Sequence, residues 1–401
     1  MIESEGRVKA TLREIFLLLT STLVFLSPFV ISPALPDMKT FFGALPNAET
    51  LVKLVITVPA LAIAIAAPFI GIVIDKWGRR NLLIGATTLF GVSGTVGFFL
   101  KSIYTILVFR AFLGLAVAGI LTCTTTLIAD YYTGAKRNRV MGFQVAIGYF
   151  SGVITLIAGG ALAEINWNYP FLLYALAFIF IPGVILFLYE PESAKQAIEK
   201  QEIEKEHKFP FFSVITGYVI IFIFMIVYYA VPTQIPFYLS NTITNLTEIQ
   251  TGIALSAATL FAGIISFSFK YLKKWLSHIL LFILSFLLVG SGYFVLTFAV
   301  SYWMFLVGLA FAGLGVGIMF PNINLWTIKD TPEKYRGRAL SMLTSLLFFG
   351  AFLSPIINSP IISKVGYSNM FLIGGIVFLV LILVPLVLYS LEYLKKRKTV
   401  S

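Results

Sequence analysis

Two charged side chains lie in apolar stretches of the sequence, where charge is rare. Arg110 lies within an apolar run of residues 103–129, and Asp37 closes an earlier run with the sequence SPALPD. A charged group inside a bilayer is costly and usually faces a partner or a water-filled cavity. If a proton is coupled, Asp37 is the best carboxylate to carry it, with Arg110 keeping it ionised until substrate or a rotation of the protein separates them. The alternative for Asp37 is an ordinary surface acid. Two other roles for Arg110 stay open: direct binding of an anionic substrate, and a structural salt bridge.

The elements that position these residues must cross a membrane. The 401 residues are 59% hydrophobic and 12% charged, whereas soluble domains carry about 25% charged residues. One span needs about 20 apolar residues, and charge clusters and turn residues divide the chain into twelve such runs. The sequence therefore predicts an all-α polytopic membrane protein with 12 transmembrane helices. The expected spans lie near residues 14–36, 50–74, 81–100, 103–129, 139–163, 169–189, 211–238, 248–269, 277–299, 302–328, 338–362 and 367–392.

The Lys and Arg residues predict the orientation of the chain. Of these 29 residues, 24 lie at the two termini and in the loops expected on the same side as the termini. Arg110 lies inside a span, and four residues lie on the opposite side: Lys39, Lys53, Lys101 and Lys364. Because cytoplasmic loops are enriched in Lys and Arg, we expect both termini in the cytoplasm. The net charge of +11 then reflects topology, and no nucleic-acid partner is expected.

A polar segment at residues 190–208 divides the expected spans into two sets of six. Its charges alternate in sign, which is typical of a solvated linker. We therefore expect three parts, namely an N-terminal six-helix bundle (1–189), a cytoplasmic linker (190–210) and a C-terminal six-helix bundle (211–401).

The two sets of spans resemble each other in sequence. GLAVAG at 114–119 recurs as GLAFAG at 308–313, and RNRVMG at 137–142 is similar to RGRALS at 336–341. A six-span unit repeated in the same orientation implies a pseudo-two-fold axis along the membrane normal. Transporters built in this way bind their substrate at the interface between the halves.

Residues 71–80 read GIVIDKWGRR and concentrate four charges between two apolar spans. This sequence is similar to the signature loop between spans 2 and 3 of the major facilitator superfamily. Twelve spans, a 6+6 repeat and a charged central linker match that family over the whole chain. In the family, the loop is a cytoplasmic latch that holds the halves together while the cavity faces outward and is released as it turns inward. The resemblance gives this role to Gly71, Asp75, Gly78, Arg79, Arg80 and Asp130.

The resemblance also implies specific contacts for the latch. Asp75 would meet the N-terminal end of the span at 338–362, where the helix dipole favours an anion. Arg79 would pair with Asp130. The alternative is that the basic residues only set the topology, but Asp75 and the two glycines of the loop favour a latch. The equivalent loop of the second half, KYLKKW at 270–275, lacks the Asp and Gly residues, so we expect a latch in the first half alone.

The resemblance indicates where a substrate would bind. In the family, spans 1, 4, 7 and 10 line the central cavity, and Arg110 resembles the span-4 arginine of many proton-coupled members. The few charges and many aromatic residues in these segments suit an uncharged or amphipathic organic substrate. Each such side chain could instead bond its own helix or pack in the core. The candidate cavity residues are Thr124, Gln144, Tyr228, Tyr229, Gln234, Asn322 and Asn324.

Together these features indicate a secondary transporter. The chain resembles the twelve-span drug–proton antiporter branch, which implies proton-coupled export of small organic compounds from a bacterial-type plasma (inner) membrane. The alternative is a sugar or organic-anion porter with Arg110 as substrate ligand.

A membrane enzyme or a sensor is a third class, but no H-E-x-x-H, G-x-S-x-G or Walker motif is present. We expect no enzyme activity, no cofactor and no metal. The expected partners are protons, a small-molecule substrate and the lipid bilayer, with the protein a monomer.

Overall fold

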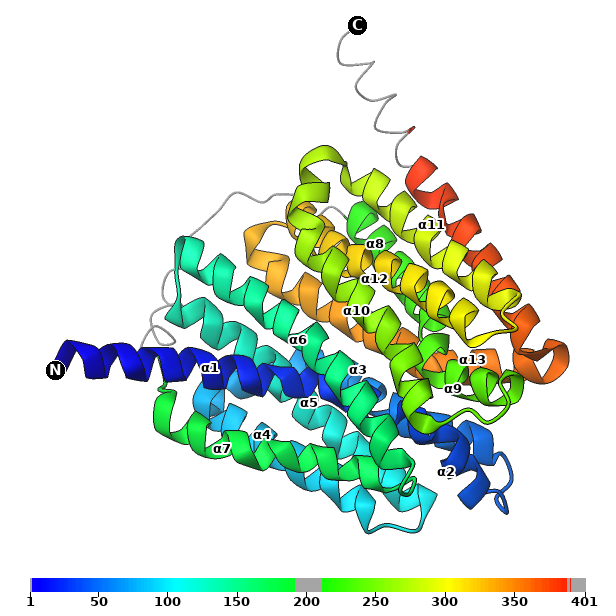
Figure 1. Ribbon diagram of the computed structural model, residues 1–401. Helices are drawn as coiled ribbons and strands as arrows, with labels where there is room; N and C mark the ends of the chain where they lie inside the picture. Colours follow the sequence, from blue (N-terminus) through cyan, green and yellow to red (C-terminus); the bar gives the residue numbers. More distant parts are fainter. Residues whose placement is uncertain (1, 192–210, 388–389, 391–401) are drawn as a thin grey trace, which may run out of the picture.

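The computed structural model describes residues 2–191, 211–387 and 390, and these residues form helices and loops without any strand (Figure 1). Helices satisfy all their main-chain hydrogen bonds internally, which lipid requires of a spanning segment. The α-helices are α1 (Ile2–Phe29), α2 (Leu35–Phe41), α3 (Ala48–Trp77), α4 (Arg79–Thr95), α5 (Ile103–Tyr131), α6 (Gly134–Ala163), α7 (Leu176–Phe187), α8 (Phe211–Tyr228), α9 (Ala230–Thr242), α10 (Glu248–Trp275), α11 (His278–Thr297), α12 (Tyr302–Asp330) and α13 (Glu333–Leu381). Three 3₁₀ segments join them: η1 (Ser32–Ala34), η2 (Val96–Phe98) and η3 (Tyr169–Ala175).

Eleven helical segments of the described residues are long and apolar enough to span a membrane, where twelve spans were expected. The difference lies in α13, in which the expected spans 338–362 and 367–392 are continuous. A straight helix of 49 residues would be about 74 Å long, more than twice the hydrocarbon thickness of a bilayer. The helix is broken at Gly366, whose φ of 82° and ψ of 171° only glycine adopts readily. The chain turns there into two arms (Figure 1).

We call residues 2–191 the first half and residues 211–387 the second half. Helices from the two halves pack in pairs, with α6 against α10, α3 against α13 and α2 against α9. Figure 1 shows α6 and α10 side by side near the centre of the molecule. Of the expected linker 190–210, residues 192–210 lie outside the described part of the chain.

Glycines allow α6 and α10 to approach each other closely. A Cβ atom on Gly160 would lie 2.4 Å from the main-chain oxygen of Glu248, and one on Gly252 would lie 2.3 Å from that of Leu156. Small residues bring helix backbones together in this way inside membranes. These contacts join the two halves at the end of the molecule that holds the loops 42–47 and 243–247, which we call the opposite end.

The other end carries the Lys- and Arg-rich loops, and we call it the basic end. Here the halves are not packed together in the same way. A Cβ atom on Gly71 of α3, Gly142 of α6 or Gly337 of α13 would have no neighbouring heavy atom within 4 Å. Residues 135–139 of α6 are exposed, whereas Gly159 and Gly160 near its other terminus are buried. The halves therefore meet at the opposite end and separate toward the basic end.

Candidate functional site

Arg110 lies in the core of the first half, where its side chain is 1% exposed. Its Nη1 atom donates a 2.8 Å hydrogen bond to the Tyr174 hydroxyl, which in turn donates to the main-chain oxygen of Ser27 at 2.9 Å. The guanidinium carbon lies 4.6 Å and 4.7 Å from the ring centroids of Phe171 and Tyr174. The buried Nη2 atom has no hydrogen-bond partner among the described residues. Aromatic rings and one hydroxyl therefore hold this cation.

Asp37 lies in the first turn of α2, at the opposite end of the molecule. Its carboxyl group is within hydrogen-bonding reach of the Glu248 carboxyl on α10 of the second half. Among the described residues, no ion pair joins Asp37 to Arg110. The structure thus does not bring together the two residues that the sequence suggested as a pair. Asp37 instead lies at the contact between the halves.

The basic loop between α3 and α4 is an ordered structure of the first half. Arg79 Nε lies 2.8 Å from the Asp130 carboxylate on α5. The main-chain N–H groups of Arg79 and Arg80 each donate a 2.8 Å hydrogen bond to the Glu190 carboxylate. Gly78 has a φ of 80°, and a Cβ there would lie 2.9 Å from the same carboxylate.

Glu190 is a site residue that the sequence analysis did not single out. Its carboxylate caps the first turn of α4, where unpaired N–H groups and the helix dipole favour an anion. The residue lies directly after the span that ends near 189, where an acid followed by a proline could have been recognised as a capping candidate.

Asp75 and Gly71 do not contact the second half. Asp75 is exposed and has no hydrogen-bond or ion-pair partner in the described part of the chain. Open space surrounds the position of a Cβ on Gly71. The expected contact between Asp75 and the start of α13 is therefore not made in this conformation, and the latch role stays a prediction.

Four of the candidate cavity residues lie on α5, on α6 and at the junction of α8 and α9. Thr124 is buried on α5 and accepts a 3.3 Å hydrogen bond from the Gln144 side chain on α6. On α8, Tyr228 stacks on Phe224 with ring centroids 5.7 Å apart. The fourth, Tyr229, is buried directly before α9. In the first half, Tyr149 of α6 packs on Phe25 of α1 with ring centroids 5.5 Å apart. A Cβ atom on Gly263 of α10 would lie 2.9 Å from the Tyr149 Cβ, so this aromatic pair lies against the second half.

Asn322 and Asn324 of α12 occupy different surroundings. Asn322 is buried and donates a 3.0 Å hydrogen bond to the main-chain oxygen of His278, while its own oxygen lies 2.9 Å from His278 Nδ1. Asn324 is exposed and donates to the Phe320 oxygen of its own helix. Asn322 thus ties α11 to α12 within the second half.

Gln234 belongs to a polar cluster between the halves at the opposite end. The Gln234 side chain is fully buried and its amide lies 3.5 Å from the Ser359 hydroxyl of α13. Lys53 of α3 approaches the same hydroxyl to 3.4 Å and pairs with Glu49 at 2.6 Å. Glu49 also pairs with Lys39 at 2.6 Å and accepts a 3.1 Å hydrogen bond from Tyr367.

Lys53 is the unexpected member of this cluster. The sequence analysis counted it among the residues on one side of the membrane, whereas its side chain is 0% exposed. Glu49 and Lys53 are spaced i and i+4, which places them on one face of a helix. This spacing was a visible signal for the ion pair, although not for its burial.

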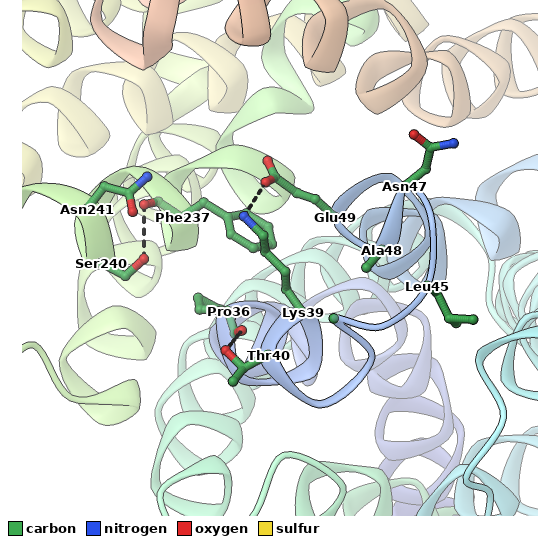
Figure 2. Close-up of a pocket in the computed structure, with 11 residues that line it drawn as sticks. Pro36, Lys39, Thr40, Leu45, Asn47, Ala48, Glu49, Phe237, Ser240 and Asn241 are labelled. Atoms are coloured by element: carbon green, nitrogen blue, oxygen red, sulfur yellow. Dashed lines mark hydrogen bonds and ion pairs between the residues drawn. The ribbon is translucent and has the colours of Figure 1, made fainter.

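An open pocket of about 590 Å³ lies beside this cluster, between α2, the start of α3 and α9 (Figure 2). Figure 2 shows Lys39 reaching across it to Glu49, with Phe237 of the second half next to them. Its lining residues are Pro36, Lys39, Thr40, Gly43, Leu45, Asn47, Ala48, Glu49, Phe237, Ser240 and Asn241.

Comparisons with known proteins agree on one family. The family model described as Major Facilitator Superfamily matches residues 17–324 and, in a second match, residues 242–401. The chain is 25% identical over 387 residues to the bacillibactin exporter of Bacillus subtilis (strain 168), covering 91% of this chain and 93% of that protein. It is 23% identical over 369 residues to the multi-drug resistance efflux pump PmrA of Streptococcus pneumoniae serotype 4, covering 86% of this chain and 89% of that protein.

A solved structure agrees at the level of the fold. The D-xylose–proton symporter has a TM-score of 0.78 and 15% identity, and the match covers 94% of this chain and 97% of that chain. Since the family model extends over nearly the whole sequence and transporters match it almost from end to end, the chain belongs to the Major Facilitator Superfamily and is a multi-pass membrane transporter.

Proposed function

We propose that this protein is a secondary transporter that exports small organic or amphipathic compounds by alternating access in exchange for protons. The two arms of α13 would count as separate spans, which makes twelve spans in two six-helix bundles joined by the linker 190–210. The protein would work as a monomer in the plasma (inner) membrane.

The observation that carries this proposal is the difference between the two ends of the molecule. The halves are packed together at the opposite end, through Gly160 and Gly252, while Gly71 and Gly142 at the basic end face open space. Alternating access requires two such states, each closed at one end. If the basic end is cytoplasmic, as the positive-inside rule predicts, the structure corresponds to the inward-facing state and the opposite end is external.

Export is favoured over import by two relatives that match most of the chain. One is an exporter of bacillibactin and another is a multidrug efflux pump. The aromatic residues Phe25 and Tyr149, which lie against α10, and Tyr228 on α8 suit flat or amphipathic organic molecules. Gln144 and Thr124 would add hydrogen-bonding groups close by.

Asp37 is our candidate for the coupled proton. Two carboxyl groups that face each other can share one proton, and Asp37 faces Glu248 of the other half. Opening the external end would part the two groups, so their proton occupancy would change with the conformation. Arg110 is held away from them by Tyr174 and Phe171, and we assign it a supporting role in the first half.

The test uses inside-out vesicles that carry a pH gradient and a fluorescent probe of that gradient. Lipophilic cations, neutral drugs, sugars and organic anions are added one class at a time. We expect dequenching with a lipophilic or amphipathic compound, because export would release protons from the vesicle lumen. The Asp37→Asn variant should retain substrate binding and lose the proton signal.

Asp75→Asn is the matched control, because it removes a carboxylate from the latch and leaves the proposed proton site intact. It should lower turnover while the remaining transport stays proton-dependent. Proton-driven flux at the wild-type level in Asp37→Asn would remove Asp37 from the mechanism. Dequenching by sugars or organic anions alone, abolished in Arg110→Gln, would support the alternative porter in which Arg110 binds the substrate.

A further inference from the structure

We propose that the Glu49–Lys53 ion pair is the external gate of this transporter. We also propose that the buried charge of Lys53 lowers the stability of the closed gate, so that the gate can open. This inference rests on the proposed alternating-access function, because it assigns residues to one of its conformational steps. It concerns the contact between α3 and the second half at the opposite end.

Lys53 is enclosed by groups from both halves. Its ammonium lies 2.6 Å from the Glu49 carboxylate of the first half. From the second half, the Ser359 hydroxyl lies 3.4 Å away and the Phe237 ring centroid lies 4.8 Å away. Tyr367 of the second half donates to Glu49 at 3.1 Å. Separation of the halves at this end would remove every second-half group from the pair and expose Lys53 to water.

The two members of the pair differ in their access to water. Glu49 is 29% exposed and has a second cationic partner in Lys39, which is 46% exposed beside the pocket in Figure 2. Lys53 is 0% exposed and depends on Glu49 for charge compensation. Burying an ammonium costs several kcal/mol of hydration, which one ion pair offsets only in part. Opening the gate restores this hydration, so the charge of Lys53 favours opening.

Because Lys53 is fully buried and Glu49 is not, we expect substitutions of the two residues to have opposite effects on the closed gate. In Glu49→Gln, Lys53 would be a buried cation without its carboxylate, which disfavours the closed gate. In Lys53→Met, Glu49 would keep Lys39 and water, and an apolar side chain would pack against Phe237, which favours the closed gate. If the pair only held α3 against the second half, both variants would weaken that contact.

Spin labels can measure the state of each end directly. Cys123 is the single cysteine of the sequence, so Cys123→Ala provides a cysteine-free background. Asn166 and Ser301 are exposed positions of the two halves at the opposite end, and Lys136 and Lys274 are exposed at the basic end. Double electron–electron resonance on each labelled pair, in lipid nanodiscs, gives the populations of the two states without any substrate.

We expect Glu49→Gln to raise the ratio of externally open to externally closed molecules by about tenfold or more. The distance between the basic-end labels should shorten in the same molecules. Adding Lys53→Met to this variant should reverse the opening, because the uncompensated cation is then gone. Lys53→Arg and Lys39→Met are the controls, and each should stay within about twofold of the wild-type ratio.

The proposal is overturned if the double variant Glu49→Gln/Lys53→Met stays as open as Glu49→Gln, or if Glu49→Gln does not open the external end. If Glu49→Gln alone fails to give a monodisperse protein, recovery in the double variant supports the buried-charge argument, and failure of both contradicts it. Label distances require no transport, so they separate this test from the vesicle test. If Glu49→Gln opens the external end and the double variant closes it again, but no compound is transported, the gate is supported and the proposed export function is refuted.

Discussion

At the scale of single residues, Arg110 shows how a cation can be held in a membrane protein without a carboxylate. Its hydrogen bond to Tyr174, the onward bond to Ser27 and two aromatic faces take the place of an ion pair. The Tyr174 hydroxyl both accepts and donates, so this one oxygen connects α5 to α1. Without the Tyr174 hydroxyl, the buried Arg110 guanidinium would lose its only hydrogen-bonded oxygen in the described part of the chain.

We predict that Tyr174→Phe destabilises the protein by about 1.5–3 kcal/mol, the range for hydrogen bonds to charged groups. Tyr293→Phe is a matched control, since its buried hydroxyl donates one 2.8 Å hydrogen bond to the Val227 main-chain oxygen and contacts no charge. That control should cost about 1 kcal/mol. Thermal unfolding of both variants in the same detergent measures the difference. Equal losses would show that Arg110 does not depend on Tyr174.

At the scale of elements, the start of α4 depends on a residue that follows α7, far later in the chain. Glu190 accepts hydrogen bonds from the first N–H groups of α4, and Gly78 leaves the space that its carboxylate occupies. Arg80 adds a 2.7 Å hydrogen bond to the Ile185 main-chain oxygen of α7. The conformation of the basic loop is therefore set by packing of α4 against α7 within the first half.

We predict that Gly78→Ala costs about 1–3 kcal/mol, because a φ of 80° with an extended ψ is strained for alanine and the Cβ would displace Glu190. Glu190→Ala should cost about 0.5–2 kcal/mol through loss of the cap. The double variant should cost less than the sum of the two single changes, since both act on one contact. Thermal unfolding of the four proteins forms the cycle, and strict additivity would refute the shared contact.

Gly71→Ala tests the other glycine of the GIVIDKWGRR motif, whose role we expect to differ from that of Gly78. It should leave the thermal stability unchanged, because a Cβ meets open space there in this conformation. If α3 approaches α13 when the cavity faces outward, the same change should lower turnover severalfold in the vesicle assay. Wild-type turnover in Gly71→Ala would argue against close packing of the latch in the other state.

At the scale of the whole molecule, the two halves are joined by close backbone contacts at one end. Gly160 and Gly252 let α6 and α10 approach until a Cβ would overlap a main-chain oxygen of the partner helix. The Glu49–Lys53 pair lies on α3 at the same end, where α3 packs against α13. Helix packing and a buried charge thus act in opposite directions on one interface, the first favouring closure and the second favouring opening.

We predict that Gly252→Ala shifts the population toward the externally open state by about tenfold, because the new methyl group must push α6 and α10 apart. Gly142→Ala is the matched control on α6, where a Cβ has no neighbour within 4 Å. The spin-label pair Asn166 and Ser301 reports both variants. An unchanged distance in Gly252→Ala would mean that the interface absorbs a methyl group without opening.

The sequence by itself determined the membrane-spanning helices and the class of the protein. Apolar runs of spanning length can satisfy their main-chain groups in lipid only as helices, so the segments were predictable within several residues. The gap expected between the last two spans, residues 363–366, contains Gly366, where α13 is broken. The motif GIVIDKWGRR carried the resemblance to the family that the comparisons show.

The tertiary structure alone decided which charged side chains meet and which are buried. Arg110 and Tyr174 are 64 residues apart in sequence, and Lys53 and Ser359 are 306 residues apart. Neither contact follows from local spacing, because it depends on how the helices pack and on which end of the molecule is closed. The same reason explains why Asp37 lies beside Glu248 and not beside Arg110, although both residues stood out as charges in apolar sequence.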